Sequence, residues 1–315
     1  MVRRPVQATG PILEPVIPAM PSPAYTVAVG VESAARTGLV GDLAVHALLE
    51  EAELTPKPAL VDRRGGGAHD DMDLGMLFSS AYALRPTFRD LATRAYGCAP
   101  SRRLREELAA IGRRGEAAMF AVTGGVNTHR GAIWTLGLLT AAAVMAPADA
   151  PPVDIAALAG RVASFPDRCA PTEASHGSLV TRRYGVAGAR GEARHGFPNV
   201  VGVALPALRA TREAGYPERF ARLDALIALI AHVDDTCLLY RGGRAALRDA
   251  QAGAQAVIAV GGNATVAGRR AVRSLEMRLL RHNASPGGST DLLAAALFLD
   301  ALLRPAAGPV LEEVA

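Results

Sequence analysis

The sequence predicts an all-α fold, a single multi-helix domain whose polar, glycine-containing loops form the functional site. Half of the 315 residues are apolar but only 4% are aromatic, and alanine and leucine dominate. This composition favours helices over β-sandwiches and barrels, which depend on β-branched and aromatic residues. Apolar residues recur at helical spacing almost everywhere after residue 33, and strand, turn and helix never alternate, so a Rossmann or P-loop architecture is not indicated.

The helices end where the chain supplies residues that break them. The first amphipathic segment stops before Thr55-Pro56, because proline cannot continue a helix and restricts the residue before it. Residues 166–196 are rich in Gly, Arg and His and are predicted to form a loop with one short helix. The predicted helices cover residues 34–53, 73–83, 86–96, 101–121, 130–146, 153–164, 198–214, 217–233, 244–260, 264–282 and 288–304.

These boundaries give one domain with two tails. Residues 1–33 are rich in proline and form neither a signal peptide nor a membrane span, so we expect a poorly ordered N-terminal tail. The helical catalytic domain is expected over 34–305, and 306–315 are expected to form a C-terminal tail.

Charge and cysteine usage exclude several classes of protein. The net charge is +4 and arginines are spread along the chain without a basic stripe interleaved with aromatics, so no nucleic-acid partner is expected. No apolar stretch is long enough to cross a membrane. Cys98, Cys169 and Cys237 are far apart and form no CxxC pair, which is typical of reduced thiols in a cytoplasmic protein.

The first polar cluster runs from Lys57 to Asp73. Lys57 is the only lysine among 34 basic residues, which suggests a site that needs a compact ammonium; the alternative is that its position is due to chance. Three glycines would let the backbone approach a ligand closely. The cluster then places an imidazole and three carboxylates within five residues, a set suited to Mg²⁺ beside phosphates: His69, Asp70, Asp71 and Asp73. The alternative is that Asp71 or Asp73 only caps a helix.

The second cluster separates two apolar helices. Glycines followed by polar and basic residues at a helix start could cradle an anion. An ordinary helix–loop–helix with Asn127 or Thr128 as the N-cap explains the same residues. The candidate anion-binding residues are Gly124, Gly125, Asn127, His129 and Arg130.

Three further clusters follow. The segment 176–198, which includes Arg190 and Glu192, either folds over a ligand or is a flexible surface loop. Asp235 and Arg241 could form an ion pair across a helix end, or supply a carboxylate and a phosphate-binding fork to a site. Asp291 is interpreted as a structural residue in the first turn of a helix.

Together these segments resemble the triphosphoribosyl-dephospho-CoA synthase family over roughly residues 36–303. The resemblance rests on five ordered motifs: TPKPALVDRRGGGAHDDMD, TGGVNTHRGAIW with LGLL, HG…YG…GARGEA…GFP, DDTCLLYRGG and GGSTDLLA. This chain departs from the usual family pattern at Ala59 (usually Gly), at Arg130 (often Lys) and at Cys237 (usually Asn).

The resemblance implies an all-helical enzyme that uses ATP and 3′-dephospho-CoA. The 2′-hydroxyl of dephospho-CoA would attack C1′ of the ATP ribose and release adenine. The product would be the precursor of the prosthetic group of an acyl-carrier protein subunit, with malonate decarboxylase favoured over citrate lyase. ATP use further implies Mg²⁺.

The reaction that the resemblance implies suggests roles for the residues of the polar clusters. A carboxylate or histidine should accept the hydroxyl proton or stabilise charge at the sugar, and cationic groups should hold the triphosphate. The candidate catalytic residues are Asp235, His69 and Asp62; the candidate metal ligands are Asp70, Asp71 and Asp73; and the candidate binding residues are Lys57, Gly124, Gly125, Asn127, His129, Arg130, Arg190, Glu192 and Arg241. The alternatives are a helical metal-dependent phosphohydrolase or glycohydrolase and, last, a non-enzymatic assembly scaffold.

Overall fold

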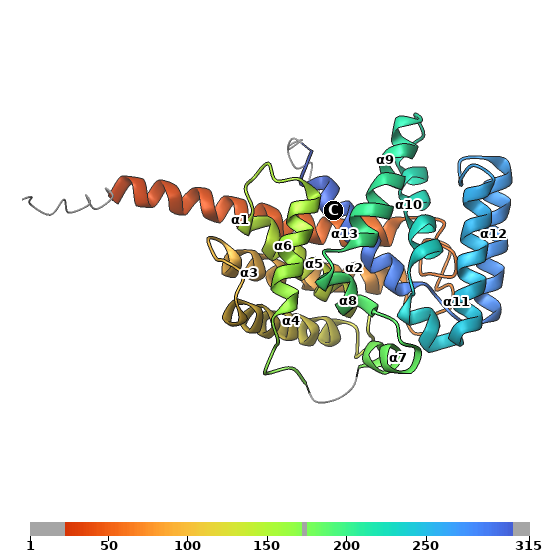
Figure 1. Ribbon diagram of the computed structural model, residues 1–315, viewed down its shortest axis with the longest axis horizontal. Coiled ribbons are helices and arrows are strands. Elements are labelled where there is room, and N and C mark those ends of the chain that lie inside the picture. The colour runs from red at the N-terminus through yellow and green to blue at the C-terminus, as the bar shows by residue number, and fades with distance from the viewer. Residues whose placement is uncertain (1–22, 172–174, 305–315) are drawn as a thin grey trace, which may run out of the picture.

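A computed structural model describes residues 23–171 and 175–304, and within them every named element is helical (Figure 1). The single β-type pairing among these residues is the isolated bridge between Asp62 and Gly65. The prediction of an all-α fold is therefore confirmed. The elements are α1 (Pro23–Glu53), α2 (Leu74–Ala83), α3 (Arg85–Ala95), α4 (Arg102–Val122), α5 (Arg130–Met145), α6 (Pro152–Ser164), α7 (His176–Tyr184), α8 (Gly188–Arg194), η1 (Val200–Ala204), α9 (Leu205–Glu213), α10 (Glu218–His232), α11 (Thr236–Ala259), α12 (Val266–Arg281) and α13 (Gly287–Ala301).

Most helix ends lie within three residues of the predicted ones, and the exceptions have local causes. α1 begins at Pro23 rather than at 34, and residues 1–22 and 305–315 lie outside the described residues. The predicted loop 166–196 contains two helices, α7 and α8, rather than one. α11 begins at Thr236 but is broken at Gly243 (φ 65°, ψ −163°), one residue before the predicted start at 244.

The core is built around two helices that are buried on nearly all sides, α5 and α13. Both are apolar around their whole circumference, which is the pattern of a helix enclosed by others. They pack against each other, and α1 packs along both α3 and α13. Figure 1 shows α5 and α13 near the middle of the molecule, with the N-terminal part of α1 extending to one side.

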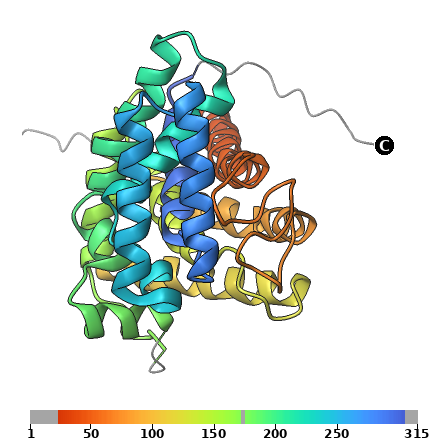
Figure 2. The ribbon, with the colours of Figure 1, turned by 90° about the vertical axis from the view of Figure 1, so that its right-hand side faces the viewer.

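The remaining helices surround this centre. α11 and α12 pair side by side, as Figure 2 shows, and α10 packs on α9, α11 and α13. The long loop between α1 and α2, orange in Figure 2, runs beside α12. Across residues 23–171 and 175–304, none of the helices combines the length and apolarity that crossing a bilayer requires.

Candidate active site

Four segments that are far apart in the sequence meet where helices α5, α11 and α13 begin. The Asp235 carboxylate, which caps α11, accepts hydrogen bonds from Ser289 of α13. Asp291 of α13 accepts the backbone N–H of Ala132 in α5. The α1–α2 loop joins them, because the Ala68 carbonyl accepts a hydrogen bond from Arg241 at 2.6 Å. The first, second, fourth and fifth clusters of the sequence thus lie together.

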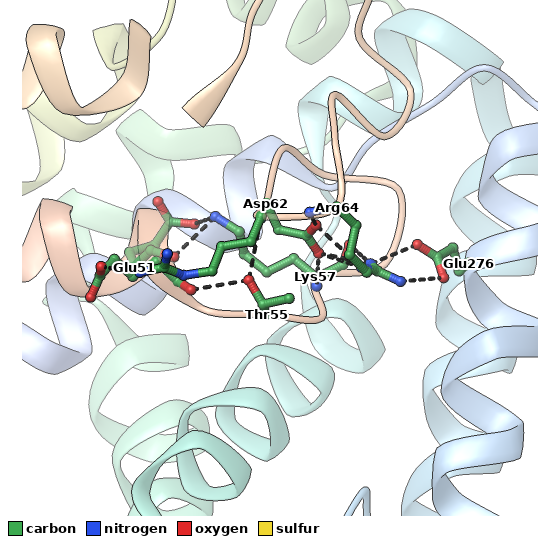
Figure 3. A network of polar contacts seen from close by, with 8 residues as sticks. Glu51, Thr55, Lys57, Asp62, Arg64 and Glu276 are labelled. Atoms are coloured by element: carbon green, nitrogen blue, oxygen red, sulfur yellow. Dashed lines mark hydrogen bonds and ion pairs between the residues drawn. The ribbon is translucent and has the colours of Figure 1, made fainter. Parts of the chain in front are cut away.

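Asp62 organises the α1–α2 loop. Its buried carboxylate accepts hydrogen bonds from the backbone N–H of Lys57 (2.8 Å), from that of Arg64 (2.7 Å) and from the Arg64 guanidinium. Arg64 in turn binds Glu276 of α12 at 2.8 Å, as Figure 3 shows. These donors occupy both oxygens of Asp62. We therefore assign Asp62 to positioning of the loop rather than to the catalytic role suggested by the sequence.

Lys57 lies inside the protein with 1% of its surface exposed. Its Nζ donates to the Glu51 carboxylate at 2.8 Å and to the Glu51 carbonyl at 3.0 Å (Figure 3). The lone lysine is thus the buried partner of a buried carboxylate. This placement differs from the predicted phosphate contact, which would require an accessible ammonium.

The His69–Asp73 segment does not form a three-carboxylate metal centre. Asp73 caps α2 by accepting the Met76 N–H at 2.8 Å, as the helix-cap alternative proposed. Asp70 is exposed, and Asp71 is exposed and lies 3.5 Å from His69. In residues 23–171 and 175–304 no three His, Cys, Asp or Glu side chains are grouped to hold a metal ion. The arrangement therefore does not fit the predicted metal centre at Asp70, Asp71 and Asp73.

Both ring nitrogens of His69 are engaged. Nδ1 lies 3.2 Å from the Arg241 guanidinium, which can only donate, and Nε2 lies 2.7 Å from the Ser285 hydroxyl. The Arg241 contact corresponds to a ring whose proton is on Nε2, while Asp71, 3.5 Å from Nδ1, acts in the opposite direction. Burial and the positive charge of Arg241 lower its pKa. His69 thus links the loop to the start of α13, and its basic nitrogen is already occupied.

His129 precedes α5 and is almost fully buried. Its Nδ1 lies 2.7 Å from the Ser80 hydroxyl, which in turn contacts Thr128, while its Nε2 is buried without a hydrogen-bond partner in the described chain. Burial and the nearby Lys57 charge lower its pKa to about 3, so the ring is neutral at physiological pH. A neutral imidazole with one unused nitrogen can position a ligand but adds no charge.

Some of the neighbouring residues of the second cluster shape the helix ends, and others offer side-chain donors to solvent. Gly124 and Gly125 are exposed, with φ of 61° and 91°, and Gly125 N–H binds the Phe120 carbonyl, so they terminate α4. Asn127 accepts the Arg130 N–H at 3.2 Å, but His129 occupies the N-cap position of α5 without a side-chain cap hydrogen bond, so neither Asn127 nor Thr128 is the N-cap. Arg130 is exposed and pairs with Glu116 through Nε. Arg130 and the Asn127 amide are exposed and carry side-chain donors that no described residue uses.

Both carboxylate oxygens of Asp235 accept hydrogen bonds within the protein, as do those of Asp62. Oδ1 accepts the N–H groups of Cys237 (2.8 Å) and Leu238 (3.3 Å), and Oδ2 accepts the N–H and hydroxyl of Ser289 (2.8 and 2.9 Å). Burial raises its pKa, although these hydrogen bonds act in the opposite direction. Its hydrogen bonds join the start of α11 to the start of α13. We assign it a positioning role in place of the predicted role as proton acceptor.

Asp291, which the sequence interpretation assigned to a structural role, lies near the start of α13. It is partly exposed, and it faces the first turn of α5 so closely that a Cβ on Gly131 would overlap its Oδ2. Burial, Glu51 and Asp235 together raise its pKa well above the usual value. The signal in the sequence was Gly131 directly after His129-Arg130, a glycine required by close approach rather than by a turn.

The third cluster includes α7 and α8, and α8 packs against α5 and α6. Glu192 accepts the backbone and side-chain N–H groups of Asn199 at 2.8 and 2.7 Å, and burial raises its pKa. It therefore holds the start of η1. Arg190 is exposed and makes no hydrogen bond or ion pair with a described residue. The structure thus leaves Arg190, and not Glu192, available to a ligand.

Comparison with known proteins covers most of the chain. A family model described as ATP:dephospho-CoA triphosphoribosyl transferase matches residues 38–309. No solved structure matches significantly.

Three similar relatives carry the name "Probable 2-(5''-triphosphoribosyl)-3'-dephosphocoenzyme-A synthase". The protein of Azotobacter vinelandii is 55% identical over 271 residues, 85% of this chain and 93% of its own length. That of Pseudomonas paraeruginosa is 56% identical over 264 residues, 84% of this chain and 90% of its own. That of Pseudomonas syringae pv. syringae is 54% identical over 273 residues, 86% and 93% of the two chains. Because both the family model and these relatives span most of the sequence, the chain belongs to the family of ATP:dephospho-CoA triphosphoribosyl transferases.

Proposed function

We propose that this chain transfers the triphosphoribosyl group of ATP to the 2′-hydroxyl of 3′-dephospho-CoA and releases adenine. Membership of the family and the names of the relatives support this reaction. The observation that carries the site assignment is the Asp291 carboxylate, which is partly exposed and has a raised pKa where α5, α11 and α13 begin.

Asp291 is the proposed proton acceptor. Among the described residues the Ala132 N–H is the one donor to its carboxylate, so an oxygen remains for a substrate hydroxyl. Burial and the neighbouring carboxylates raise its pKa, and once ionised such a carboxylate is a stronger base than an ordinary aspartate. By contrast, the oxygens of Asp62 and Asp235 are already occupied.

The step balances with these groups. The hydroxyl oxygen forms a bond to C1′ of the ATP ribose while the C1′–N9 bond to adenine breaks. The hydroxyl proton passes to Asp291, and the departing adenine takes up one proton, so the carboxylate is restored. Positive charge that develops on the ribose is stabilised by the negative potential of Asp291 before it takes up the proton, and by that of Asp235.

Arg130 and Arg241 are the proposed phosphate contacts on this side of the site. Both are exposed, and each has guanidinium donors beyond those used in its protein contacts. Arginine forks match phosphate geometry well. Mg²⁺ bound to the triphosphate remains a prediction from ATP use, and no step of the reaction is assigned to it here.

The destination of the product is a further part of the proposal. We propose that it supplies the prosthetic group of an acyl-carrier subunit, that of malonate decarboxylase in preference to citrate lyase, in the cytoplasm. Incubating the purified product with the apo-carrier of each system, together with the corresponding transfer enzyme, would show which carrier is modified.

The reaction itself is tested by chromatographic detection of adenine. Free adenine should form with ATP and dephospho-CoA together and not with ATP alone. Adenine from ATP alone would indicate a glycohydrolase, and ADP or phosphate would indicate a phosphohydrolase. Either result would contradict the proposed transfer.

A further inference from the structure

We propose that Arg105, Arg190 and Arg194, beside Trp134, form a second anion site that binds the polyphosphate group of a nucleotide substrate. The inference rests on the proposed use of nucleotide substrates and adds to it a site on α4, α5 and α8. Arg190 was a candidate from the sequence, whereas Arg105, Arg194 and Trp134 become candidates only through the structure.

Arg105 is an unusual arginine because it is buried and unpaired. It is 9% exposed, and its Nε is buried without a hydrogen-bond partner in the described chain. The guanidinium carbon lies 4.9 Å from the centroid of the Trp134 ring, so an aromatic face holds the group in place. A buried guanidinium without an acceptor is costly, and a bound anion would remove that cost.

The surrounding charge is predominantly positive. Arg190 and Arg194 are four residues apart on α8 and so share a face, and neither pairs with a described residue. Arg113 lies nearby but is paired with Asp167 at 2.7 Å. Burial, and then Arg190, Arg113 and Arg194, lower the pKa of Arg105, while Asp167 acts in the opposite direction. The patch therefore has more cations than carboxylates.

The patch differs from other partly buried arginines of the chain. Arg212 binds both Glu218 and Asp300, and Arg222 binds Glu218. Those contacts neutralise guanidinium groups within the protein. Around Arg105 the nearby acid, Asp167, is paired with Arg113, and no described residue makes a hydrogen bond to the Arg105 guanidinium. The missing acceptor is the one that a phosphate provides, with oxygens matched to arginine forks.

The fold places this patch near the proposed reaction centre. The Trp134 indole N–H donates to the Ala189 carbonyl at 3.2 Å, which ties α8 to α5. Trp134 follows Gly131 by three residues, so it lies on a similar side of α5, about 4.5 Å farther along the axis. A nucleotide with its ribose at Asp291 could therefore direct its 5′-phosphates toward Arg105. ATP and dephospho-CoA both carry a polyphosphate at that position.

Binding without turnover tests the inference. The Arg190→Ala/Arg194→Ala double variant removes two exposed side chains, Arg105→Lys keeps the charge of the buried one but removes its fork, and Arg102→Ala removes an exposed arginine from the same helix as a control. Calorimetry with pyrophosphate, with ATP alone and with dephospho-CoA alone should show binding to the double variant weakened about tenfold or more for pyrophosphate and for one nucleotide. The affected nucleotide identifies the source of the phosphate, and Arg102→Ala should bind all three like the wild type.

Unchanged affinities in the double variant, or equal losses in Arg102→Ala, would overturn the inference. If Arg105→Lys fails to fold, the double variant still decides the result, because Arg190 and Arg194 are exposed. Adenine release is measured separately. Lost pyrophosphate affinity without any wild-type adenine release would support the anion site and reject the proposed function, and the reverse pattern would reject only the anion site.

Discussion

Asp62 and Arg105 are both buried charged residues in arginine-rich surroundings, but their contacts are opposite. Asp62 accepts hydrogen bonds from two backbone N–H groups and from the Arg64 guanidinium. Arg105 has an aromatic ring for support and no acceptor among the described residues. The first arrangement is complete without a ligand, and the second is not. The number of hydrogen-bond partners within the protein therefore distinguishes a buried charged residue that stabilises the fold from one that is available to a substrate.

The same comparison separates the carboxylates at the helix starts. Asp235 uses both oxygens to join α11 to α13, whereas Asp291 accepts one protein N–H and is partly exposed. We expect substitutions of residues whose hydrogen-bonding atoms are all occupied within the protein to lower stability. Substitutions of residues with unoccupied hydrogen-bonding atoms are expected to lower activity.

The largest expected effect is on catalysis, from Asp291→Asn. Asparagine keeps an acceptor for the Ala132 N–H but cannot take a proton, so adenine release should fall by about 10²–10⁴-fold. At acidic pH, where Asp291 is protonated and asparagine is its neutral analogue, the melting temperature should change little. The control is Asp90→Asn, which neutralises an exposed aspartate on α3. A rate for Asp291→Asn within a fewfold of wild type would remove Asp291 from the mechanism.

The pH dependence of adenine release should also reflect the role of Asp291 as proton acceptor. Asp291 must be ionised to act, and its pKa is raised, so the acid limb of the rate profile should lie above the range of an ordinary aspartate. The folded protein also holds this proton more tightly than the unfolded chain does. The stability that protonated Asp291 contributes is therefore complete below its unfolded pKa and is lost as pH rises through the folded pKa. Asp291→Asn removes that loss, so its stability relative to wild type should increase with pH in thermal melts.

A large effect on stability, with a smaller one on chemistry, is expected from Lys57→Met. The substitution leaves the Glu51 carboxylate buried without its cation, and should cost about 3–5 kcal/mol in the free energy of unfolding. Adding Glu51→Gln should recover much of the loss in denaturant titrations. A Lys57→Arg variant with normal stability and a tenfold higher KM for ATP would contradict the structural role and support the phosphate contact.

A smaller loss should follow Glu276→Ala. This change removes the α12 partner of Arg64, whose side chain is 44% exposed, so solvent screening limits the cost to about 1 kcal/mol or less. The control is Glu53→Ala, which breaks the more exposed pair with Arg63 and should cost less. The difference between the two should shrink at high salt. Equal losses would mean that bridging the loop to α12 adds no stability.

The smallest effect is expected at Ala59. This residue has φ of 57°, where an L side chain is strained by about 1–2 kcal/mol. In Ala59→Gly, relief of that strain should roughly cancel the lost methyl burial and the greater freedom of the unfolded glycine. Ala225→Gly, at an equally buried position inside α10, has no strain to relieve and should be clearly more destabilising. Similar losses at both positions would contradict the left-handed conformation.

The sequence alone determined the helical fold class, most helix boundaries and the segments that gather at the site. Helix periodicity and breakers are local properties, so Thr55-Pro56 and Gly243 marked boundaries without reference to the rest of the chain. The second helix within 166–196 was missed because short helices are stabilised by tertiary packing more than by their own pattern.

Only the tertiary structure decided which of the polar residues are already paired. Lys57 was conspicuous in the sequence but proved to be the partner of Glu51, and Asp235 proved to be a cap. Asp291 was interpreted as structural and Arg105 was not singled out, yet both are among the described groups left without a full set of partners. The physical reason is that a hydrogen-bond partner, a neighbouring charge and burial are set by residues distant in the chain, and no local pattern records them.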